Sequence, residues 1–354
     1  MLGKDNRVRA RLASGERPVL VVVIDAEEEF AWGAPFDRAS IGTTSIACQP
    51  MMHECVFDKF GIVPTYMCDW PVTTAAASAA TLRGLMEEGR CDIGAHLHPW
   101  VSPPHVEQLT RFNSYAGNLP RELEYDKLHR LTDAIAHAFG RRPVAFKAGR
   151  YGLGRHTAES IASLGYTIDA SVVPYTSFAS DGGPDFREHD AHPYWFRAGQ
   201  RALLEVPVTT GYTGWLRAVG PQLYGLAQGP SGRSLRMGGV LARLRALERI
   251  RLSPETASTA EMRRLASTLR SGGCEVFSLT YHSPSMAVGH TPYVRSTADL
   301  KRFIATVHDF CSWFRDELGG QFVRLAQLPE MAGGARPAMQ AHPDNEMLEQ
   351  RMMG

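Results

Sequence analysis

Three carboxylates directly follow the first strongly apolar stretch of the sequence and could bind a cation. The run PVLVVVID ends at Asp25, and Glu27 and Glu29 follow at alternate positions. Side chains alternate along a strand, so these acids share one face if the strand continues through them. Acids after a buried strand are costly unless they bind a cation or pair with a base, whereas a solvated acidic loop is the competing interpretation.

A pair of histidines follows a second apolar stretch, in the segment DIGAHLHPW. His96 and His98 are separated by one residue and can therefore project to the same side. Neutral imidazole is the commonest side-chain ligand for metals, and two imidazoles with one carboxylate form a familiar catalytic metal site. Two histidines at the end of a strand, without any role in metal binding, are the competing interpretation. Together with one of the three acids, however, they favour a divalent metal site.

Two further segments add a basic residue and a third imidazole. Lys147 and Arg150 lie among the glycines of FKAGRYGLG, where a cation could keep a catalytic carboxylate ionised or bind an anionic substrate. His282 ends the apolar run of LTYH and could be a general acid. A basic surface turn and a core histidine are the alternatives.

The elements that must position these residues alternate between strands and helices. Apolar, β-branched runs predict strands, and segments of helical period between them predict helices. This alternation favours a parallel α/β sheet, open or barrel-shaped, with functional loops at the carboxyl ends of the strands. The predicted strands cover 18–25, 62–69, 91–96, 144–148, 167–173, 202–212 and 274–282, and the main predicted helices cover 45–61, 76–90, 121–140, 154–166, 253–273 and 297–319.

The remaining segments predict one catalytic domain with additions. Residues 1–17 form a charged N-terminal segment, and the domain covers 18–330 with insertions near 176–200 and 220–260. Within the second insertion, GGVLARLRALERIRL predicts a basic amphipathic helix that covers the barrel. Residues 331–354 lack periodicity and are expected to form a flexible tail.

Composition excludes several classes of function. The 354 residues include 44% hydrophobic and 21% charged residues, with 38 basic against 37 acidic side chains and a net charge of +1. This balance is typical of a globular protein and gives no support to nucleic-acid binding. No apolar run is long enough for membrane insertion, and no apolar signal segment precedes residue 18. The six cysteines lack paired spacing, so we expect reduced, buried thiols and a cytoplasmic location.

The order of the motifs resembles a known family. DAEEEF, GAHLHPW, KAGRYGLG, GYTIDASVVP, LLEVPVT and YHSPSM follow one another between about Val19 and His282. This series is similar to the polysaccharide deacetylases of the NodB-homology group, carbohydrate esterase family four, and most to their WalW-like branch. The resemblance implies a distorted (β/α) barrel and a divalent metal, often zinc. It also implies removal of an N-acetyl or O-acetyl group from a sugar or glycan precursor.

The resemblance also implies a role for each candidate residue. Asp25 matches the catalytic base, His282 the general acid, and Arg150, or less well Lys147, the basic residue that orients the base. Glu27 and His96 match metal ligands. Four residues are expected to contact the carbohydrate: Trp100, Lys147, Tyr151 and Tyr281.

Two departures from the family pattern leave alternatives open. The usual H-x-x-x-H would place the second histidine ligand at position 100, where this chain has Trp100, and Ala26 replaces the second acid of the usual Asp-Asp pair. Either Glu27, His96 and His98 hold the metal, or the site is altered and the protein binds glycans without catalysis. A hydrolase of a non-sugar amide or imide bond on the same scaffold is a third possibility.

Overall fold

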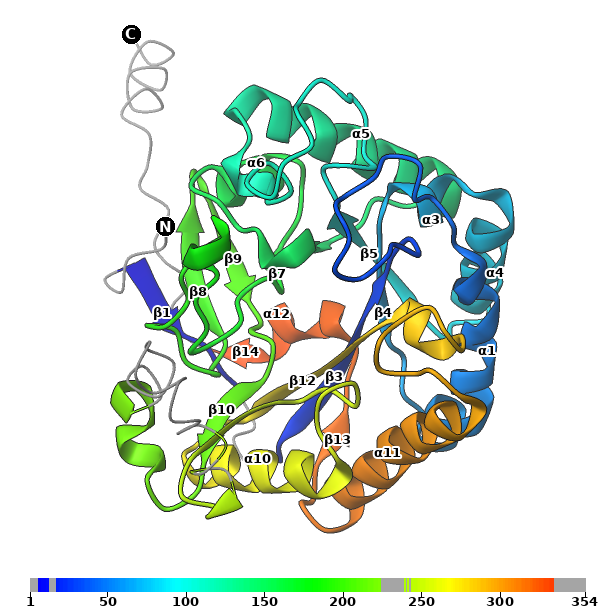
Figure 1. Cartoon of the computed structure of the whole chain (residues 1–354). Coiled ribbons are helices and arrows are strands. Elements are labelled where there is room, and N and C mark those ends of the chain that lie inside the picture. Colours follow the sequence, from blue (N-terminus) through cyan, green and yellow to red (C-terminus); the bar gives the residue numbers. More distant parts are fainter. Residues whose placement is uncertain (1–5, 13–16, 224–238, 240, 242, 334–354) are drawn as a thin grey trace, which may run out of the picture.

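A ten-stranded sheet curls around the centre of the protein, with helices on its outer side (Figure 1). The computed structural model describes residues 6–12, 17–223, 239, 241 and 243–333. Neighbouring strands from β12 to β9 run parallel, and β8 and β1 are added antiparallel at one edge. In spatial order the strands are β1 (Arg7–Arg9), β8 (Tyr194–Ala198), β9 (Arg201–Glu205), β7 (Ile168–Asp169), β6 (Ala145–Ala148), β5 (Asp92–Leu97), β4 (Thr65–Cys68), β3 (Val19–Ala26) and β12 (Val276–His282), and β13 (Gln321–Phe322) also pairs with β3.

Irregular hydrogen bonds bridge the gap between the segment that follows β9 and strand β12. The Leu252 N–H donates to the Thr209 carbonyl (2.8 Å), and the Thr280 N–H donates to the Leu252 carbonyl (3.2 Å). These single bonds replace a regular strand pair, so the barrel is distorted. Two small sheets accompany it: β10 (Thr210–Thr213) with β11 (Glu248–Arg251), and β2 (Arg11–Leu12) with β14 (Ala332–Gly333).

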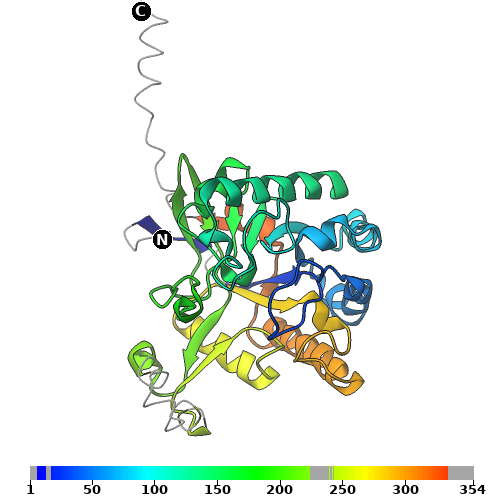
Figure 2. The same cartoon turned by 45° about the horizontal axis from the view of Figure 1, so that its top comes forward.

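Helices cover the outside of the barrel. The long helices α5 and α11 lie on opposite sides of it in both views (Figures 1 and 2). The helices are α1 (Gln49–Met52), α2 (Asp58–Phe60), α3 (Trp70–Thr74), α4 (Ala76–Glu87), α5 (Arg121–Phe139), α6 (Thr157–Ser163), α10 (Thr259–Ser271), α11 (Thr297–Asp316) and α12 (Leu328–Met331). Shorter turns are η2 (Thr44–Cys48), η3 (His53–Phe57), η4 (Ala116–Asn118), η5 (Gly149–Tyr151), η6 (Ala179–Asp181), η7 (Arg217–Val219), η8 (Ser283–Met286) and η9 (Leu325–Gln327).

Strand β3 shows how the core positions the site. All eight of its residues are buried, as expected for a parallel strand covered on both faces. Its even-numbered residues from Leu20 to Ile24 pack in one apolar cluster with the outer helices, and its odd-numbered residues from Val19 to Val23 pack in a second cluster inside the barrel. Asp25 continues the odd series and therefore faces the interior.

The structure confirms the distorted (β/α) barrel and corrects three local predictions. Of the expected basic helix at 238–252, residues 239, 241 and 243 are helical, whereas 248–251 form strand β11, because their backbone pairs with β10. The expected irregular insertion at 176–200 contains β8, and the charged N-terminal segment contributes β1 to the sheet edge. Of the expected tail, 334–354 lies outside the described residues.

Two general expectations can also be compared with the structure. No helix within the described ranges combines the length and hydropathy needed to cross a bilayer. All six cysteines are free thiols, and Cys68, Cys91, Cys274 and Cys311 are buried.

Candidate active site

Four interior-facing polar residues meet at the carboxyl ends of neighbouring strands. Asp25 of β3 lies opposite His282 of β12, and His96 of β5 lies opposite Lys147 of β6. Each is the interior member of its strand, because the residues that flank it in sequence pack outward or against the helices. Strand alternation therefore gathers side chains that are far apart in the sequence.

Asp25 and Lys147 form a buried ion pair. The Lys147 Nζ lies 2.6 and 2.8 Å from the two Asp25 oxygens and 3.0 Å from the Thr280 hydroxyl. Burial alone would raise the pKa of Asp25. The nearby Lys147 ammonium, with His96 and His282, outweighs burial and lowers this pKa below its ordinary value. Asp25 is thus a carboxylate at neutral pH.

Lys147 occupies the place beside Asp25 that was expected for Arg150. Arg150 instead pairs with Asp181 and donates to the Ser114 hydroxyl, and its guanidinium lies 4.1 Å from the centre of the Tyr115 ring. Arg150 follows the end of β6, beyond the alternation that turns Lys147 inward. Lys147 is also corrected as a substrate contact, because its side chain is completely buried and its ammonium is used by Asp25.

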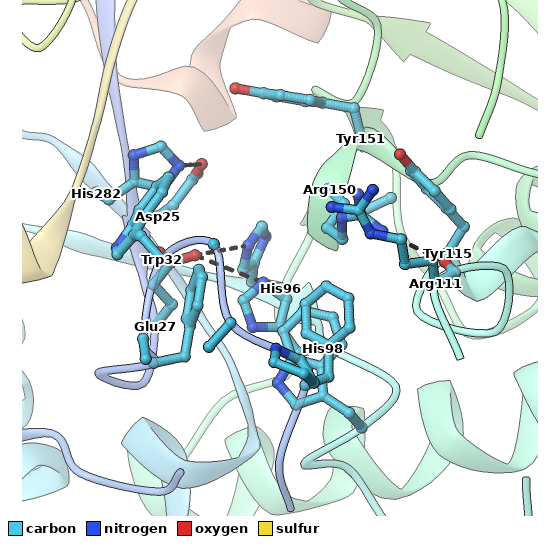
Figure 3. Close-up of a pocket in the computed structure, with 18 of the residues that line it drawn as sticks. Asp25, Glu27, Trp32, His96, His98, Arg111, Tyr115, Arg150, Tyr151 and His282 are labelled. Carbon is cyan, nitrogen blue, oxygen red and sulfur yellow. Dashed lines mark hydrogen bonds and ion pairs between the residues drawn. The ribbon is translucent and has the colours of Figure 1, made fainter. Parts of the chain in front are cut away.

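The predicted metal ligands lie together. Glu27 Oε2 is 3.5 Å from Nε2 of His96 and 3.5 Å from Nε2 of His98, and one candidate ligand atom from each residue lies within 4.8 Å of the others (Figure 3). His96 Nδ1 is 2.9 Å from the Lys147 carbonyl, and His98 Nδ1 is 2.7 Å from Glu28 Oε2. Because these oxygens accept, each Nδ1 carries the proton and each Nε2 lone pair is directed to the cluster.

The protonation states of His96 and His98 and an unpaired oxygen of Glu27 are suited to binding a divalent cation. Burial lowers the pKa of His96, and it lowers the pKa of His98 to about 4, so both rings are neutral, the form that binds metals. Burial also raises the pKa of Glu27 to about 7, which a bound cation would reverse. Glu27 Oε1 is buried and has no hydrogen-bond partner among the described residues.

A residue that the sequence analysis missed fixes His98. Glu28 accepts hydrogen bonds from His98 Nδ1 and from the Trp100 indole N–H, both at 2.7 Å. The His98 and Trp100 rings stack with centroids 4.2 Å apart. Gly149 allows this placement, because a Cβ there would lie 2.2 Å from His98 Cδ2. The run of three glutamates was the available signal, but alternation directed attention to Glu27 and Glu29 only.

Glu28 also belongs to a second group with metal-like proximity, formed with Asp69 and His98 Nδ1. Its ligand atoms are already committed to hydrogen bonds. Asp69 accepts from the Glu28 N–H (2.7 Å) and from the Val72 N–H (2.8 Å). We therefore infer that this second group positions His98 for the first group, Glu27, His96 and His98.

Two residues that were expected near the site, Glu29 and Tyr281, do not line it. The strand ends at Ala26, so Glu29 turns away and accepts from the Thr44 hydroxyl and the Ser45 N–H. Tyr281, expected to contact sugar, is fully buried and packs edge-on against Phe303 of α11 at 5.3 Å. It is the outward neighbour of His282 in β12, so strand alternation directs it to the helices.

His282 is held next to Asp25 by an acid that the sequence analysis also missed. Its Nδ1 lies 2.8 Å from Glu255 Oε2, and its Nε2 lies 3.7 Å from Asp25 Oδ2. Burial alone would lower the pKa of His282, but Glu255, Glu27 and Asp25 raise it well above its ordinary value. His282 is therefore an imidazolium at neutral pH. Glu255 was predicted as part of a helix, but it precedes α10, which begins after the Ser258 cap.

These groups open into a cavity of about 600 Å³. Trp100 and Tyr151, both expected to contact substrate, line it together with Phe30, Trp32 and Tyr293. Its volume is within the range of small-molecule sites. The arrangement provides a carboxylate base, a protonated imidazole and a ligand set for a cation around one chamber.

Comparisons with known proteins support the fold. The sequence matches no family model and no curated protein. A protein described as a polysaccharide deacetylase from Mycobacterium smegmatis aligns with TM-score 0.53 and 16% identity, covering 96% of this chain and 100% of that chain. Puue allantoinase aligns with TM-score 0.54 and 12% identity, covering 90% and 91%. At these identities the two structures establish a shared fold, the distorted barrel found in polysaccharide deacetylases.

Proposed function

We propose that the protein is a metal-dependent hydrolase that removes an acetyl group from a sugar or glycan precursor. The observation that carries this proposal is the convergence of Asp25, His282 and the group Glu27, His96 and His98 on one cavity. A divalent ion held by that group would polarise an acyl carbonyl and lower the pKa of a bound water. Zinc suits two imidazoles and one carboxylate, and is the metal we propose.

The protein's own residues would divide the proton transfers. Asp25, kept ionised by Lys147, takes the proton from the attacking water. His282, kept protonated by Glu255, gives a proton to the departing nitrogen or oxygen. Glu28 fixes the His98 ring, so the ligand set is ordered before a cation binds.

The sugar assignment is supported by the aromatic lining and by the motif resemblance. Trp32 and Tyr151 offer ring faces on which a pyranose can stack, whereas Trp100 is buried between His98 and Phe36. The similarity of the motifs to the WalW-like branch favours a glycan precursor as substrate. A cytoplasmic location and a role in glycan biosynthesis remain predictions from the sequence.

The likeness to an allantoinase supports a second candidate, hydrolysis of a non-sugar amide or imide bond. The same base, acid and cation site would serve that reaction. A glycan-binding protein with an inactive site is the non-enzymatic alternative, and it predicts that the purified protein holds no metal.

The test measures acetate release from N- and O-acetylated sugars by zinc-loaded protein, alongside a panel of non-sugar amides. We expect acetate from a sugar, and losses of at least about 100-fold in kcat for Asp25→Asn and His96→Ala. Asp58→Asn, a surface change on α2, is the matched control and retains activity. Full activity in both site variants, or hydrolysis of the amides alone, would overturn the proposal.

A further inference from the structure

One wall of the cavity is cationic. Of the charged side chains that line it in the described ranges, Asp25 and Glu27 are the acids, and both belong to the catalytic cluster. Three arginines line it as well: Arg111, Arg150 and Arg251. Figure 3 shows Arg150 and Arg111 across the cavity from Asp25. Two of the three arginines therefore lie across the cavity from the catalytic cluster.

Two of the arginines share one carboxylate. Asp181 pairs with Arg150 through Oδ2 and with Arg111 through Oδ1, the latter at 2.9 Å. The Tyr115 ring lies against the Arg150 guanidinium and fixes its plane. One negative charge against two positive charges leaves a net charge of +1 in this group.

Arg251 adds a second positive charge beside Tyr151. Its Nη1 donates to the Tyr151 hydroxyl oxygen at 3.0 Å, and its guanidinium carbon lies 5.1 Å from the Tyr151 ring centre. No carboxylate of the described residues lies within ion-pair distance of Arg251. Because the Tyr151 oxygen accepts from Arg251, its own proton is available to a ligand.

The backbone that presents these groups is strained. Arg150 and Tyr151 are consecutive non-glycine residues with φ of 53° and 58°. L-residues rarely adopt this conformation, and such strain concentrates where a site requires a particular side-chain direction. Both side chains line the cavity, so the strain accompanies the placement of a guanidinium and a hydroxyl in its wall.

We propose that the substrate carries an anionic group, a carboxylate or a phosphate, which binds to Arg251 and the Tyr151 hydroxyl while the acyl group lies at the Glu27 end. This inference rests on the proposed function, since it names the class of acylated substrate. Guanidinium groups match carboxylate and phosphate oxygens in geometry and charge. The cavity is large enough to hold a charged substituent in addition to the acylated ring.

The experiment measures binding by calorimetry in chelator-treated protein, so that neither metal nor turnover contributes. The probes are N-acetylglucosamine, N-acetylglucosamine 1-phosphate and N-acetylmuramic acid. We expect at least one anionic probe to bind about 10- to 100-fold more tightly than the neutral sugar, and to weaken with added salt. Which probe gains identifies phosphate or carboxylate as the recognised group.

Two variants test whether Arg251 and Tyr151 cause the tighter binding of anionic probes. Arg251→Gln should remove most of the preference for the anionic probe, and Tyr151→Phe, which keeps the ring and removes the hydroxyl, should reduce this preference. Arg302→Gln, on the exposed face of α11, is the charge-matched control. Equal binding of all three probes, or an anionic preference that survives in Arg251→Gln, would overturn the inference.

The two proposals fail separately. Acetate release at equal rates from neutral and anionic sugars would leave the proposed function intact and contradict the anion site. Arginine-dependent anion binding without acetate release from any sugar would support the anion site and contradict the proposed function.

Discussion

Replacing Lys147 with methionine tests the assignment of Asp25 as the ionised base. Both side chains are almost completely buried, and the ammonium contacts both carboxylate oxygens. Removing one partner of a buried pair costs about 3–5 kcal/mol, because it leaves an uncompensated charge. Loss of the ammonium also leaves burial as the dominant influence, and burial raises the pKa of Asp25.

The sign of the pH effect follows from the direction of the shift. In the native protein the pKa of Asp25 is lowered, so its pairing stabilises the fold above the unfolded pKa and is lost as the pH falls. In Lys147→Met, burial dominates and the carboxyl takes up a proton at a higher pH than in the native protein. The acid limb of the kcat/KM profile should therefore move to higher pH.

The assay is acetate release as a function of pH, with thermal melts of the same samples. Arg150→Met is the matched control and should leave the acid limb in place. A double-mutant cycle with Asp25→Asn should give a coupling energy of about 3–5 kcal/mol in stability. An unchanged acid limb in Lys147→Met, with a coupling energy below about 1 kcal/mol, would show that Lys147 does not keep Asp25 ionised.

Three further predictions concern other buried groups. Burial raises the pKa of Glu124 to about 7, so its contribution to stability is present below the unfolded pKa and is lost as the pH rises through 7. Glu124→Gln should remove about 3 kcal/mol of this pH dependence in thermal melts between pH 5 and 8, and an unchanged dependence would contradict it. Gly149→Ala should displace His98 and weaken zinc about 10- to 100-fold in a chelator competition, whereas native affinity would show that the contact is unimportant. Glu255→Gln should lower the pKa of His282 and shift the basic limb of the kcat/KM profile downward, and a fixed limb would exclude the pairing.

Much of the fold could be predicted because its signals are local. The apolar run of β3 and the periodic helices α5 and α11 stand out in the sequence. Residues 248–251 were wrongly expected to be helical because their arginines fit a helical face, whereas pairing with β10 stabilises a strand. That pairing partner lies about 35 residues earlier, and helical periodicity in the segment contains no information about it.

The sequence predicted several residues of the candidate site, but not which of them form ion pairs and hydrogen bonds with one another. Alternation led us to expect the acids and the histidines on shared faces, and Glu27, His96 and His98 lie together although β3 ends at Ala26 and β5 at Leu97. Whether Lys147 or Arg150 reaches Asp25 depends on where β6 ends, and one residue of shift changes the face. Glu28 and Glu255 act through tertiary hydrogen bonds to histidines, and neither contact has a sequence period.

The most direct test of the central claim is acetate release from an N-acetylated sugar during titration of chelator-treated protein with zinc. The account predicts that the rate rises with added zinc and saturates at a single ion per chain, and that Glu27→Gln and His96→Ala show no such rise. Absence of acetate at every zinc ratio, for every acetylated sugar, would contradict it.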